Sequence, residues 1–411
     1  MSDALPVSIV IVSRDRPAAL RRCMEGVAQL QYPVFEVVVV ADPAGVAAAQ
    51  AMPFADAVKI VPFDRANISQ ARNLGISHAA GEIIAFIDDD AVPEPSWLTY
   101  LVAPFAREEV ACAGGFVRAR NGISFQWTAR SVDAQGQSKP LDVSPTRATV
   151  FRAKGGRAIK TEGTNMAVRR EVLVALGGFD PGFSFYLDET DLNLRLMRAG
   201  HATAIVPLAE VHHGFEESPR RRRDRVPRDL FDIGASWAVF QRKYIPEDAR
   251  RMHWRARRSE ERQRLVRHMV AGRLEPRDVR RLMRRLDQGY GQGLARQRGG
   301  AEISGSAASA FRQMPLRSGP AVALSGRVWN RVRLRREAQL RADRGERVTL
   351  IILSPTALYH RVRFSPEGFW EQTGGIWGRA ERDEPLIRFW SFRARVRQEL
   401  FRIEKQRLIP G

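Results

Sequence analysis

The chain has 411 residues, of which 44% are hydrophobic and 27% are charged, and its formal net charge is +20 at pH 7. A chain of this length and apolar content forms a substantial core and two or more domains, which excludes a disordered or fibrous protein. Cys23 and Cys112 are too few for a disulfide framework and no secretory leader is recognisable, so we expect a cytoplasmic protein. No apolar run approaches the roughly 20 residues of a membrane-spanning helix, so we expect that the protein is not integral to a membrane.

The charge is unevenly distributed along the chain. Residues 1–215 hold 21 Lys and Arg against 23 Asp and Glu, whereas residues 216–411 hold 45 against 23. A strongly basic half usually indicates an acidic partner, which is nucleic acid, an anionic membrane surface or a phosphorylated substrate. Solvated, arginine-rich helix faces would give the same excess without any partner, so the charge alone does not decide.

The first part of the chain alternates short β-branched runs with helical patterns. These runs are apolar throughout, which is typical of strands covered on both faces, and they predict a doubly wound, mostly parallel α/β sheet. In this architecture ligands bind at the carboxyl ends of the strands, where Asp42 and the acids at 88–90 lie. The predicted strands are 7–12, 37–40, 59–61, 83–87, 110–113 and 149–151, and the predicted helices are 17–30, 69–80, 169–176 and 192–198.

The pattern changes after Gly214 and becomes mainly helical and rich in arginine. A basic run at 220–223 leads into helical sequence at 230–286, glycines at 289–305 suggest a flexible joint, and a basic helix at 327–344 precedes an isolated strand at 348–353. We therefore predict four segments: a catalytic domain (1–215), a basic helical extension (216–288), a flexible linker (289–310) and a basic accessory region (311–411).

Three consecutive carboxylates, Asp88, Asp89 and Asp90, follow the buried run 83–87. Because adjacent carboxylates repel one another, this much charge at a strand end needs a cation, and a divalent ion with oxygen ligands is the obvious candidate. Asp88 and Asp90 are two residues apart on an extended chain, so they point the same way and can reach one ion. The alternative is a solvated acidic turn.

The motifs of the first half resemble those of the family 2 glycosyltransferases. The resemblance covers residues 6 to about 215 and implies a GT-A fold, a nucleoside-diphosphate sugar donor, Mn²⁺ or Mg²⁺, and inversion at the anomeric carbon. Seven motifs occur in the family's order: Val7-Ser8-Ile9-Val10-Ile11, Asp42, Ala71-Arg72-Asn73, Phe86-Ile87-Asp88-Asp89-Asp90, Gly163-Thr164-Asn165, Gly177-Gly178-Phe179-Asp180 and Asp188-Glu189-Thr190-Asp191-Leu192.

The resemblance also implies roles for the donor and metal residues. Asp90 matches the metal-binding Asp. Asp88 and Asp89 match positions that contact ribose or donor sugar, and Asp88 could also share the ion. Asp42 matches the acid that accepts a hydrogen bond from uracil; because Ala41 replaces a second acid, a UDP-sugar is favoured only slightly over guanosine or thymidine donors. Arg72 matches the arginine that faces the nucleotide, with a surface arginine as its alternative. Ser13, at the end of the first strand, completes the predicted donor contacts.

The general base and a further metal ligand come from later motifs. An inverting transfer needs a base for the acceptor hydroxyl. We predict Glu189 as this base, with Asp188 as its rival and Asp191 as a third acid of the site. The alternative is that these acids only cap the helix N-terminus, and it suits Asp191 best. His212 is predicted as a metal or diphosphate ligand because its His-x-Gly spacing fits the family; a structural histidine is the alternative.

Three functions fit the basic tail, and three fit the whole chain. The tail could close over the donor diphosphate, hold the enzyme on the anionic inner face of a membrane near a lipid-linked acceptor, or bind nucleic acid, which the sparse aromatics before residue 329 disfavour. We predict an inverting, metal-dependent glycosyltransferase that acts on a saccharide or lipid-linked acceptor in cell-surface polysaccharide or glycolipid synthesis. The alternatives are a noncatalytic sugar-nucleotide-binding scaffold, against which the intact acids argue, and a sugar nucleotidyltransferase, whose glycine-rich loop is missing after Ser13.

Overall fold

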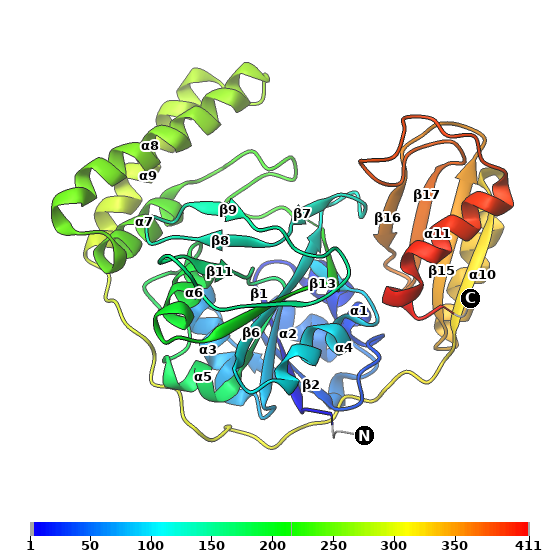
Figure 1. The fold of residues 1–411 in the computed structure, drawn as a ribbon, viewed down its shortest axis with the longest axis horizontal. Coiled ribbons are helices and arrows are strands. Elements are labelled where there is room, and N and C mark those ends of the chain that lie inside the picture. Colours follow the sequence, from blue (N-terminus) through cyan, green and yellow to red (C-terminus); the bar gives the residue numbers. More distant parts are fainter. Residues whose placement is uncertain (1–3, 215, 410–411) are drawn as a thin grey trace.

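The structure is a computed structural model, and it describes residues 4–214 and 216–409. Figure 1 shows a central α/β part, a helical arm that projects from it, and a small α/β part that ends the chain. We call these the core region (residues 4–230), the helical projection (231–294) and the C-terminal region (321–409). The segment 295–320, which joins the last two, is called the strap.

The core region is built on a ten-stranded sheet in the order β10-β13-β6-β12-β4-β1-β2-β3, to which β5 and β7 are attached through β13 and β6. The four strands β3, β2, β1 and β4 are parallel, β12 runs antiparallel between β4 and β6, and β13 is parallel to β6. The predicted doubly wound sheet is therefore confirmed. The strands are β1 (Val7–Ser13), β2 (Phe35–Ala41), β3 (Val58–Pro62), β4 (Ile83–Asp88), β5 (Ala91–Pro93), β6 (Val110–Arg118), β7 (Phe125–Trp127), β10 (Thr149–Phe151), β12 (Met166–Arg169) and β13 (Ala202–His213).

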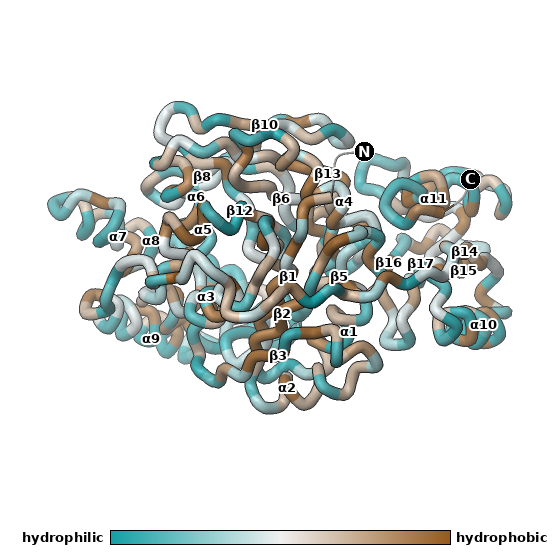
Figure 2. Tube along the Cα trace, turned by 90° about the horizontal axis from the view of Figure 1, so that it is seen from below, coloured by the Kyte–Doolittle hydropathy of each residue, from teal (hydrophilic) through white to brown (hydrophobic). Residues whose placement is uncertain are grey.

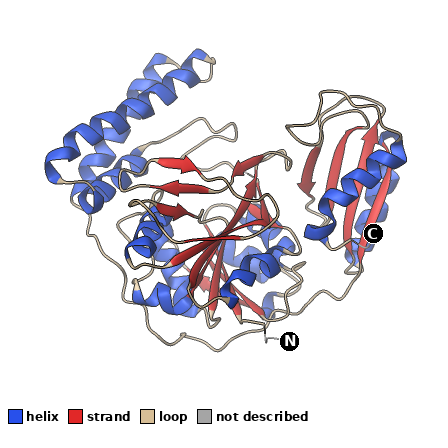
Figure 3. Ribbon diagram, viewed as in Figure 1, coloured by secondary structure: helices blue, strands red, loops and turns tan. Residues whose placement is uncertain are grey.

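Both faces of this sheet are covered by helices, as Figure 3 shows. Successive side chains of a strand point to opposite faces, so Ile9 and Ile11 join the core on one side while Val10 joins the core on the other. The strands β1–β3 accordingly show the hydrophobic colour in Figure 2. The covering helices are α1 (Pro17–Val27), α2 (Pro43–Gln50) and α4 (Trp97–Val102) on one face, and α3 (Ile68–His78), α5 (Arg170–Ala175) and α6 (Asp188–Arg198) on the other.

A small second sheet lies beside α6. It is formed by β8 (Arg130–Val132), β9 (Ser138–Pro140) and β11 (Ala158–Lys160), all antiparallel. Part of it comes from the polar stretch 131–146, where the sequence shows no apolar run. Its strand β11 contacts α6 and so places Lys160 near the start of that helix.

The helical projection consists of α7 (Phe231–Tyr244), α8 (Glu247–Val270) and α9 (Pro276–Leu294). The glycines from residue 289, predicted to begin a flexible linker, lie inside α9 instead. A Cβ on Gly289 would lie 1.9 Å from the Phe231 carbonyl, and one on Gly293 would lie 2.3 Å from that of Ala235. The start of the predicted linker is thus corrected: these glycines let α9 approach α7 closely.

The strap has no regular helix or strand, yet it is hydrogen-bonded to the core region. The amide of Ala308 donates to the Ser77 carbonyl and that of Met314 donates to Phe35, at 2.8 Å each. The Met314 side chain is buried in the core beside α1 and β2. The strap therefore reaches the C-terminal region along a fixed path.

The C-terminal region is a second α/β unit. Its strands form a sheet in the order β14-β15-β17-β16, with β14, β15 and β17 parallel. The strand predicted at 348–353 is β15 in the middle of this sheet, so its predicted isolation is corrected. The elements are β14 (Ala321–Arg327), α10 (Arg331–Asp343), β15 (Arg347–Ser354), β16 (Arg361–Phe364), β17 (Trp370–Gly375) and α11 (Phe392–Arg407).

Among the described residues, no helix combines the length and the apolar character that crossing a bilayer requires.

Candidate active site

A pocket at the carboxyl ends of β1, β2 and β4 is lined by two of the predicted donor residues, Ser13 and Asp88, and not by the other three, Asp42, Arg72 and Asp89. The pocket has a volume of about 350 Å³, and both predicted metal carboxylates, Asp88 and Asp90, line it. Its other walls come from the loop after β1, the start of α3 and the basic segment after β13; they include Ser13, Arg14, Asp15, Arg16, Asn67, Phe185, His213, Arg220 and Arg221. A larger hollow of about 640 Å³ in the C-terminal region is lined by none of the predicted site residues.

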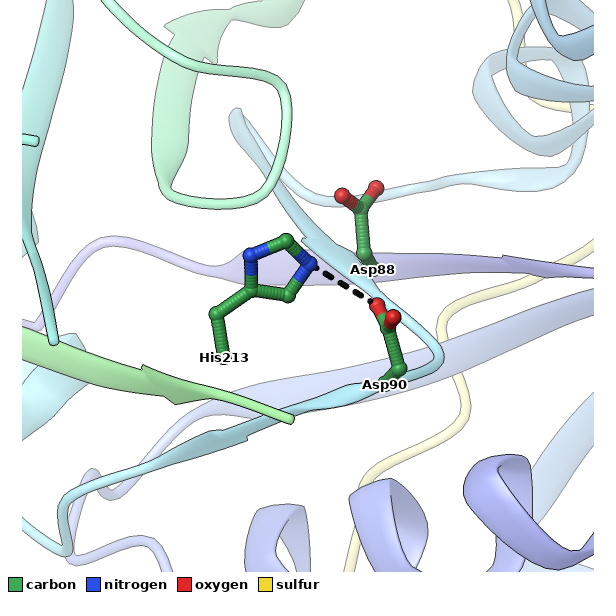
Figure 4. Close-up of side chains that lie close together, drawn as sticks. All are labelled: Asp88, Asp90 and His213. Carbon is green, nitrogen blue, oxygen red and sulfur yellow. Dashed lines mark hydrogen bonds and ion pairs between the residues drawn. The ribbon is translucent and has the colours of Figure 1, made fainter. Parts of the chain in front are cut away.

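Two carboxylates and one imidazole converge at the end of β4. Asp88, Asp90 and His213 each offer one ligand atom within 4.8 Å of the others, as Figure 4 shows. His213 Nε2 lies 3.1 Å from Asp90 Oδ1, and its Nδ1 lies 3.0 Å from Gln126 Oε1. Each ring nitrogen of His213 thus faces an acceptor oxygen, and a metal ion bound between Nε2 and Asp90 would take the place of the Nε2 proton. This donor set fits a divalent metal ion.

His213, rather than the predicted His212, lies at this cluster. The two neighbours point to opposite sides of β13, and His212 Nε2 is 2.8 Å from Glu94 Oε1, while its ring packs against Trp370 with centroids 4.6 Å apart. Burial lowers the pKa of His212, although its contact with Glu94 opposes this shift. The prediction for His212 is corrected: the spacing to Gly214 identified the right strand end but the wrong face.

Asp89 points away from the metal cluster and is held by the loop after β1. Ser13 Oγ donates to Asp89 at 2.7 Å, and Arg16 pairs with Asp89 at 2.5 Å and with Asp90 at 3.1 Å. Burial, opposed by Arg16 and reinforced by Asp90, raises the pKa of Asp89 to about 7. Although burial alone would raise it, His213 and then Arg16 hold the pKa of Asp90 below its usual range. Ser13 lines the pocket while its hydroxyl faces Asp89.

Asp42 holds the same loop through backbone amides. Its Oδ1 accepts from Gly45 at 3.1 Å as the N-cap of α2, and its Oδ2 accepts from Asp15 at 3.2 Å. Asp15 has a φ of 60°, in the left-handed region that side chains disfavour, so the contact fixes a strained turn. The carboxylate is buried behind the residues that line the pocket.

Arg72 joins the metal cluster to the acids of α6. Its guanidinium donates to Asp88 at 3.2 Å and also bonds the carboxylate of Asp188. The side chain is buried, which excludes the alternative of a surface arginine. A Cβ on Gly163 would come within 2.4 Å of Arg72 Nη2, so the glycine of the Gly163-Thr164-Asn165 motif leaves room for this guanidinium.

Asp188 and Glu189 form a coupled pair in the first turn of α6. Burial and the neighbouring charge of Glu189 raise the pKa of Asp188 to about 8, against the effect of Arg72. Although burial opposes it, Lys160, whose Nζ lies 3.5 Å from Glu189, lowers the pKa of Glu189. Tyr186 and Leu187, with φ of 75° and 68°, precede the pair. Two consecutive left-handed residues are costly, and such strain concentrates at functional sites.

Asp191 contacts α7 instead of the pocket and is corrected as a site residue. Its carboxylate accepts from Arg195 at 2.8 Å and from the Tyr244 hydroxyl at 2.7 Å, and it pairs with Lys243 at 2.5 Å. The side chain is fully buried between α6 and α7. Asp191 therefore fastens the helical projection to the core region.

Sequence reasoning missed Arg16, Gln126 and Lys160 at this site. The signal for Arg16 was available, because three acids at a strand end require a nearby cation, whereas Gln126 and Lys160 are distant in sequence. The basic run after β13 also reaches the pocket, where Arg220 Nε bonds Asp232 at 2.6 Å. The Glu216 amide donates to Asp90 Oδ2 at 3.0 Å, so this segment covers the metal cluster.

The family profile "Glycosyltransferase like family 2" matches residues 5–230 of the 411. The chain belongs to this family of glycosyltransferases. The predicted family and, with the doubly wound sheet of the core region, the GT-A type α/β fold are thereby confirmed.

Curated relatives share the same part of the chain. The O-antigen biosynthesis protein RfbC of Myxococcus xanthus is 29% identical over 246 residues, 57% of this chain and 19% of that protein. The probable glycosyltransferase YdaM of Bacillus subtilis is 27% identical over 225 residues, 51% of this chain and 50% of that protein. The chain thus spans half or less of the length of these relatives.

Two of the solved structures that align with this chain contain a nucleotide and Mn²⁺. GalNAc-T7 with UDP, GalNAc and Mn²⁺ aligns with a TM-score of 0.43 and 20% identity, over 58% of this chain and 48% of that one. The mannosyltransferase PcManGT of Pyrobaculum calidifontis with GDP-Man and Mn²⁺ aligns with a TM-score of 0.39 and 16% identity, over 72% of this chain and 88% of that one.

Proposed function

We propose that this protein is an inverting, divalent-metal-dependent glycosyltransferase that moves a sugar from a nucleoside diphosphate to an acceptor hydroxyl. The observation that carries the proposal is the convergence of Asp88, Asp90 and His213 in a pocket at the carboxyl ends of the strands. These three side chains would hold Mn²⁺ or Mg²⁺, which would neutralise the charge that develops on the diphosphate as the sugar leaves.

The donor pocket supplies further cationic groups from the chain itself. Arg16 lies against Asp89 and Asp90, and Arg220 and Arg221 line the opposite wall. Arginine forks match phosphate oxygens, so the basic segment after β13 would bind the diphosphate and exclude water. A UDP-sugar remains the first donor to test, although Asp42, which matches the uracil-binding acid, is buried here and holds the amides of Asp15 and Gly45.

Glu189 is the proposed general base. Inverting transfer needs a carboxylate that accepts the acceptor's proton on the face opposite the leaving group. The Asp188 carboxylate is bound by Arg72 and nearly fully buried, while the Glu189 side chain keeps 18% of its surface exposed. Arg72 would then position the pair by holding Asp188, and Asp188 stays the rival for the role of base.

The acceptor is proposed to be a saccharide or a lipid-linked saccharide of a cell-surface polysaccharide or glycolipid. The similarity to an O-antigen biosynthesis protein supports this class. Peripheral binding to an anionic membrane surface, through the arginines beyond residue 216, would bring the enzyme to a lipid-linked acceptor. A noncatalytic scaffold would have no use for both a metal cluster and a buried acid pair.

One experiment tests the reaction directly. The purified protein is incubated with Mn²⁺ and a panel of nucleotide sugars, and the release of nucleoside diphosphate is measured with and without EDTA; NMR then gives the anomeric configuration of the product. We expect release from one donor class, loss of release with EDTA, and an inverted product. Release that is unaffected by EDTA would contradict the metal site, and no release from any donor would contradict the proposed function.

A further inference from the structure

The last turn of α11 is buried against the core region, whereas one face of the helix before it is exposed. Phe401 keeps 66% of its surface, whereas Gln406 and Arg407 are buried. The Ser96 amide donates to the Gln406 carbonyl at 3.0 Å. Arg407 donates from Nε and Nη2 to the two oxygens of Glu94, at 2.9 and 3.0 Å. The C-terminal region thus inserts a cation into the core region.

Glu94 connects the two strands that carry the metal cluster. Strand β5 pairs antiparallel with the end of β13, aligning Ala91 with His213 and Val92 with His212. A further backbone hydrogen bond extends the pairing at each end of the ladder. At one end the Gly214 amide donates to the Asp90 carbonyl at 2.7 Å, and at the other the Glu94 amide donates to the Glu210 carbonyl at 3.1 Å. The Glu94 carboxylate, which Arg407 holds, also accepts from His212 on the partner strand. One side chain therefore links both strands, and the metal-facing Asp90 and His213 lie at the other end of the same short ladder.

A ring of the C-terminal region completes the junction. Trp370 of β17 is buried, with its ring 4.4 Å from the Arg407 guanidinium and 4.6 Å from the His212 ring. Beside it lies an interdomain cavity of about 40 Å³, which is large enough for a water molecule. His212 Nδ1 and Gln406 Oε1 are buried without a protein partner and both residues line this cavity, so a water there would satisfy them.

The junction depends on Arg407 because its charges are buried. Arg407 and Glu94 each expose only 2% of their surface. Although burial alone would raise it, Arg407 and then His212 keep the pKa of Glu94 below its usual range. Removing one partner of a buried ion pair leaves an uncompensated charge in the interior. The surrounding backbone must then shift so that water can reach this charge.

We propose that Arg407 is a positioning residue for the metal site: through Glu94 and His212 it fixes the β5–β13 ladder, and thereby the distance between Asp90 and His213. The inference rests on the proposed function, because it assigns the C-terminal region a part in building that site. It makes the region a required component of metal binding rather than an appended module.

The test measures Mn²⁺ affinity of the full-length protein without donor, from the electron paramagnetic resonance signal of free Mn²⁺. Arg407→Met keeps the aliphatic stem and removes the charge. Arg407→Lys keeps the charge but not the two-pronged contact. Arg402→Met is the matched control, because Arg402 lies on the same helix and pairs with Glu384 and Glu399 inside the C-terminal region. Hydrogen exchange of peptides covering 208–213 reports on the ladder directly.

We expect Arg407→Met to weaken Mn²⁺ binding about 10-fold or more, the scale of outer contacts of metal ligands, with faster exchange at 208–213. Arg407→Lys should fall in between, which keeps the proposal testable if the methionine variant does not fold, and Arg402→Met should change affinity less than about 2-fold. Wild-type affinity in both Arg407 variants would overturn the inference alone. Wild-type protein that binds no Mn²⁺ would overturn the metal-dependent function and this inference with it.

Discussion

Two parallel sheets occur in this chain, and their strand ends differ in charge. In the core region β4 ends at Asp88, next to Asp89 and Asp90. In the C-terminal region the hollow beside the ends of β15 and β17 is lined by Arg331, Arg335 and Arg361. Both sheets provide the place where α/β proteins bind ligands, but the cluster of two carboxylates and an imidazole that fits a metal ion, Asp88, Asp90 and His213, lies at the first. The difference teaches that the residues at the strand ends, and not the sheet itself, define the chemistry.

The largest expected effect comes from removing a metal ligand at the first sheet. Asp90→Ala should lower donor cleavage about 1000-fold or more, because the ion contributes several kcal/mol to stabilising the leaving group, and Mn²⁺ binding should be lost with it. Nucleoside-diphosphate release and Mn²⁺ titration measure the two effects. Glu108→Ala, an exposed acid elsewhere in the core region, is the control. If Asp90→Ala stays active, the acids at the end of β4 are not needed for the reaction, and the proposed chemical difference between the two sheets is wrong.

The next largest effect is expected at the proposed base. Glu189→Gln should lower sugar transfer about 100-fold or more while leaving Mn²⁺ and donor affinity near wild type, since a general base acts only in the reacting complex. Steady-state kinetics with donor binding measured separately would show this split. If Asp188→Asn abolishes transfer and Glu189→Gln does not, the base is Asp188.

A smaller effect is expected on stability as pH changes. The folded pKa of Asp188 is about 8, above its ordinary value of 3.8, so the folded state binds a proton that the unfolded state has already lost between these values. This stability is complete below about pH 4 and decreases as pH rises toward 8, by up to about 1.4 kcal/mol per pH unit. Asp188→Asn should therefore flatten the decline. Melting curves at pH 6 and pH 8.5 compare the two proteins, and parallel curves would refute the assignment.

The smallest effect is expected at the strand ends of the second sheet. Arg361→Ala removes an exposed arginine that lines the C-terminal hollow, and transfer should change less than about 2-fold, as is usual for surface substitutions away from a site. The assay uses the donor and acceptor found for the wild type. A loss of 10-fold or more would mean that the second sheet contributes to acceptor binding.

The core region could be predicted in detail because its strands are unbroken apolar runs and its acids follow them. His212 was wrong because neighbouring residues on a strand face opposite sides, and the sequence does not say which side faces the pocket. The C-terminal sheet escaped prediction for a different reason: β16 and β17 are mainly polar, and the apolar run of β14 is only four residues long and is followed by Ser, Gly and Arg. Asp191 was predicted as a site residue because it is close in sequence to Asp188 and Glu189. Successive residues of a helix point in different directions, however, and Asp191 points toward α7.

The strap has a consequence for how this protein can change. It contacts Phe35 and Glu36 at the amino end of β2. The polypeptide between the helical projection and the C-terminal region therefore runs below the core region in the view of Figure 1, where it is yellow. The donor pocket opens at the other ends of these strands. Residues inserted between the fixed points of the strap, Ala308 and Met314, would therefore lie at the side of the sheet away from the pocket entrance.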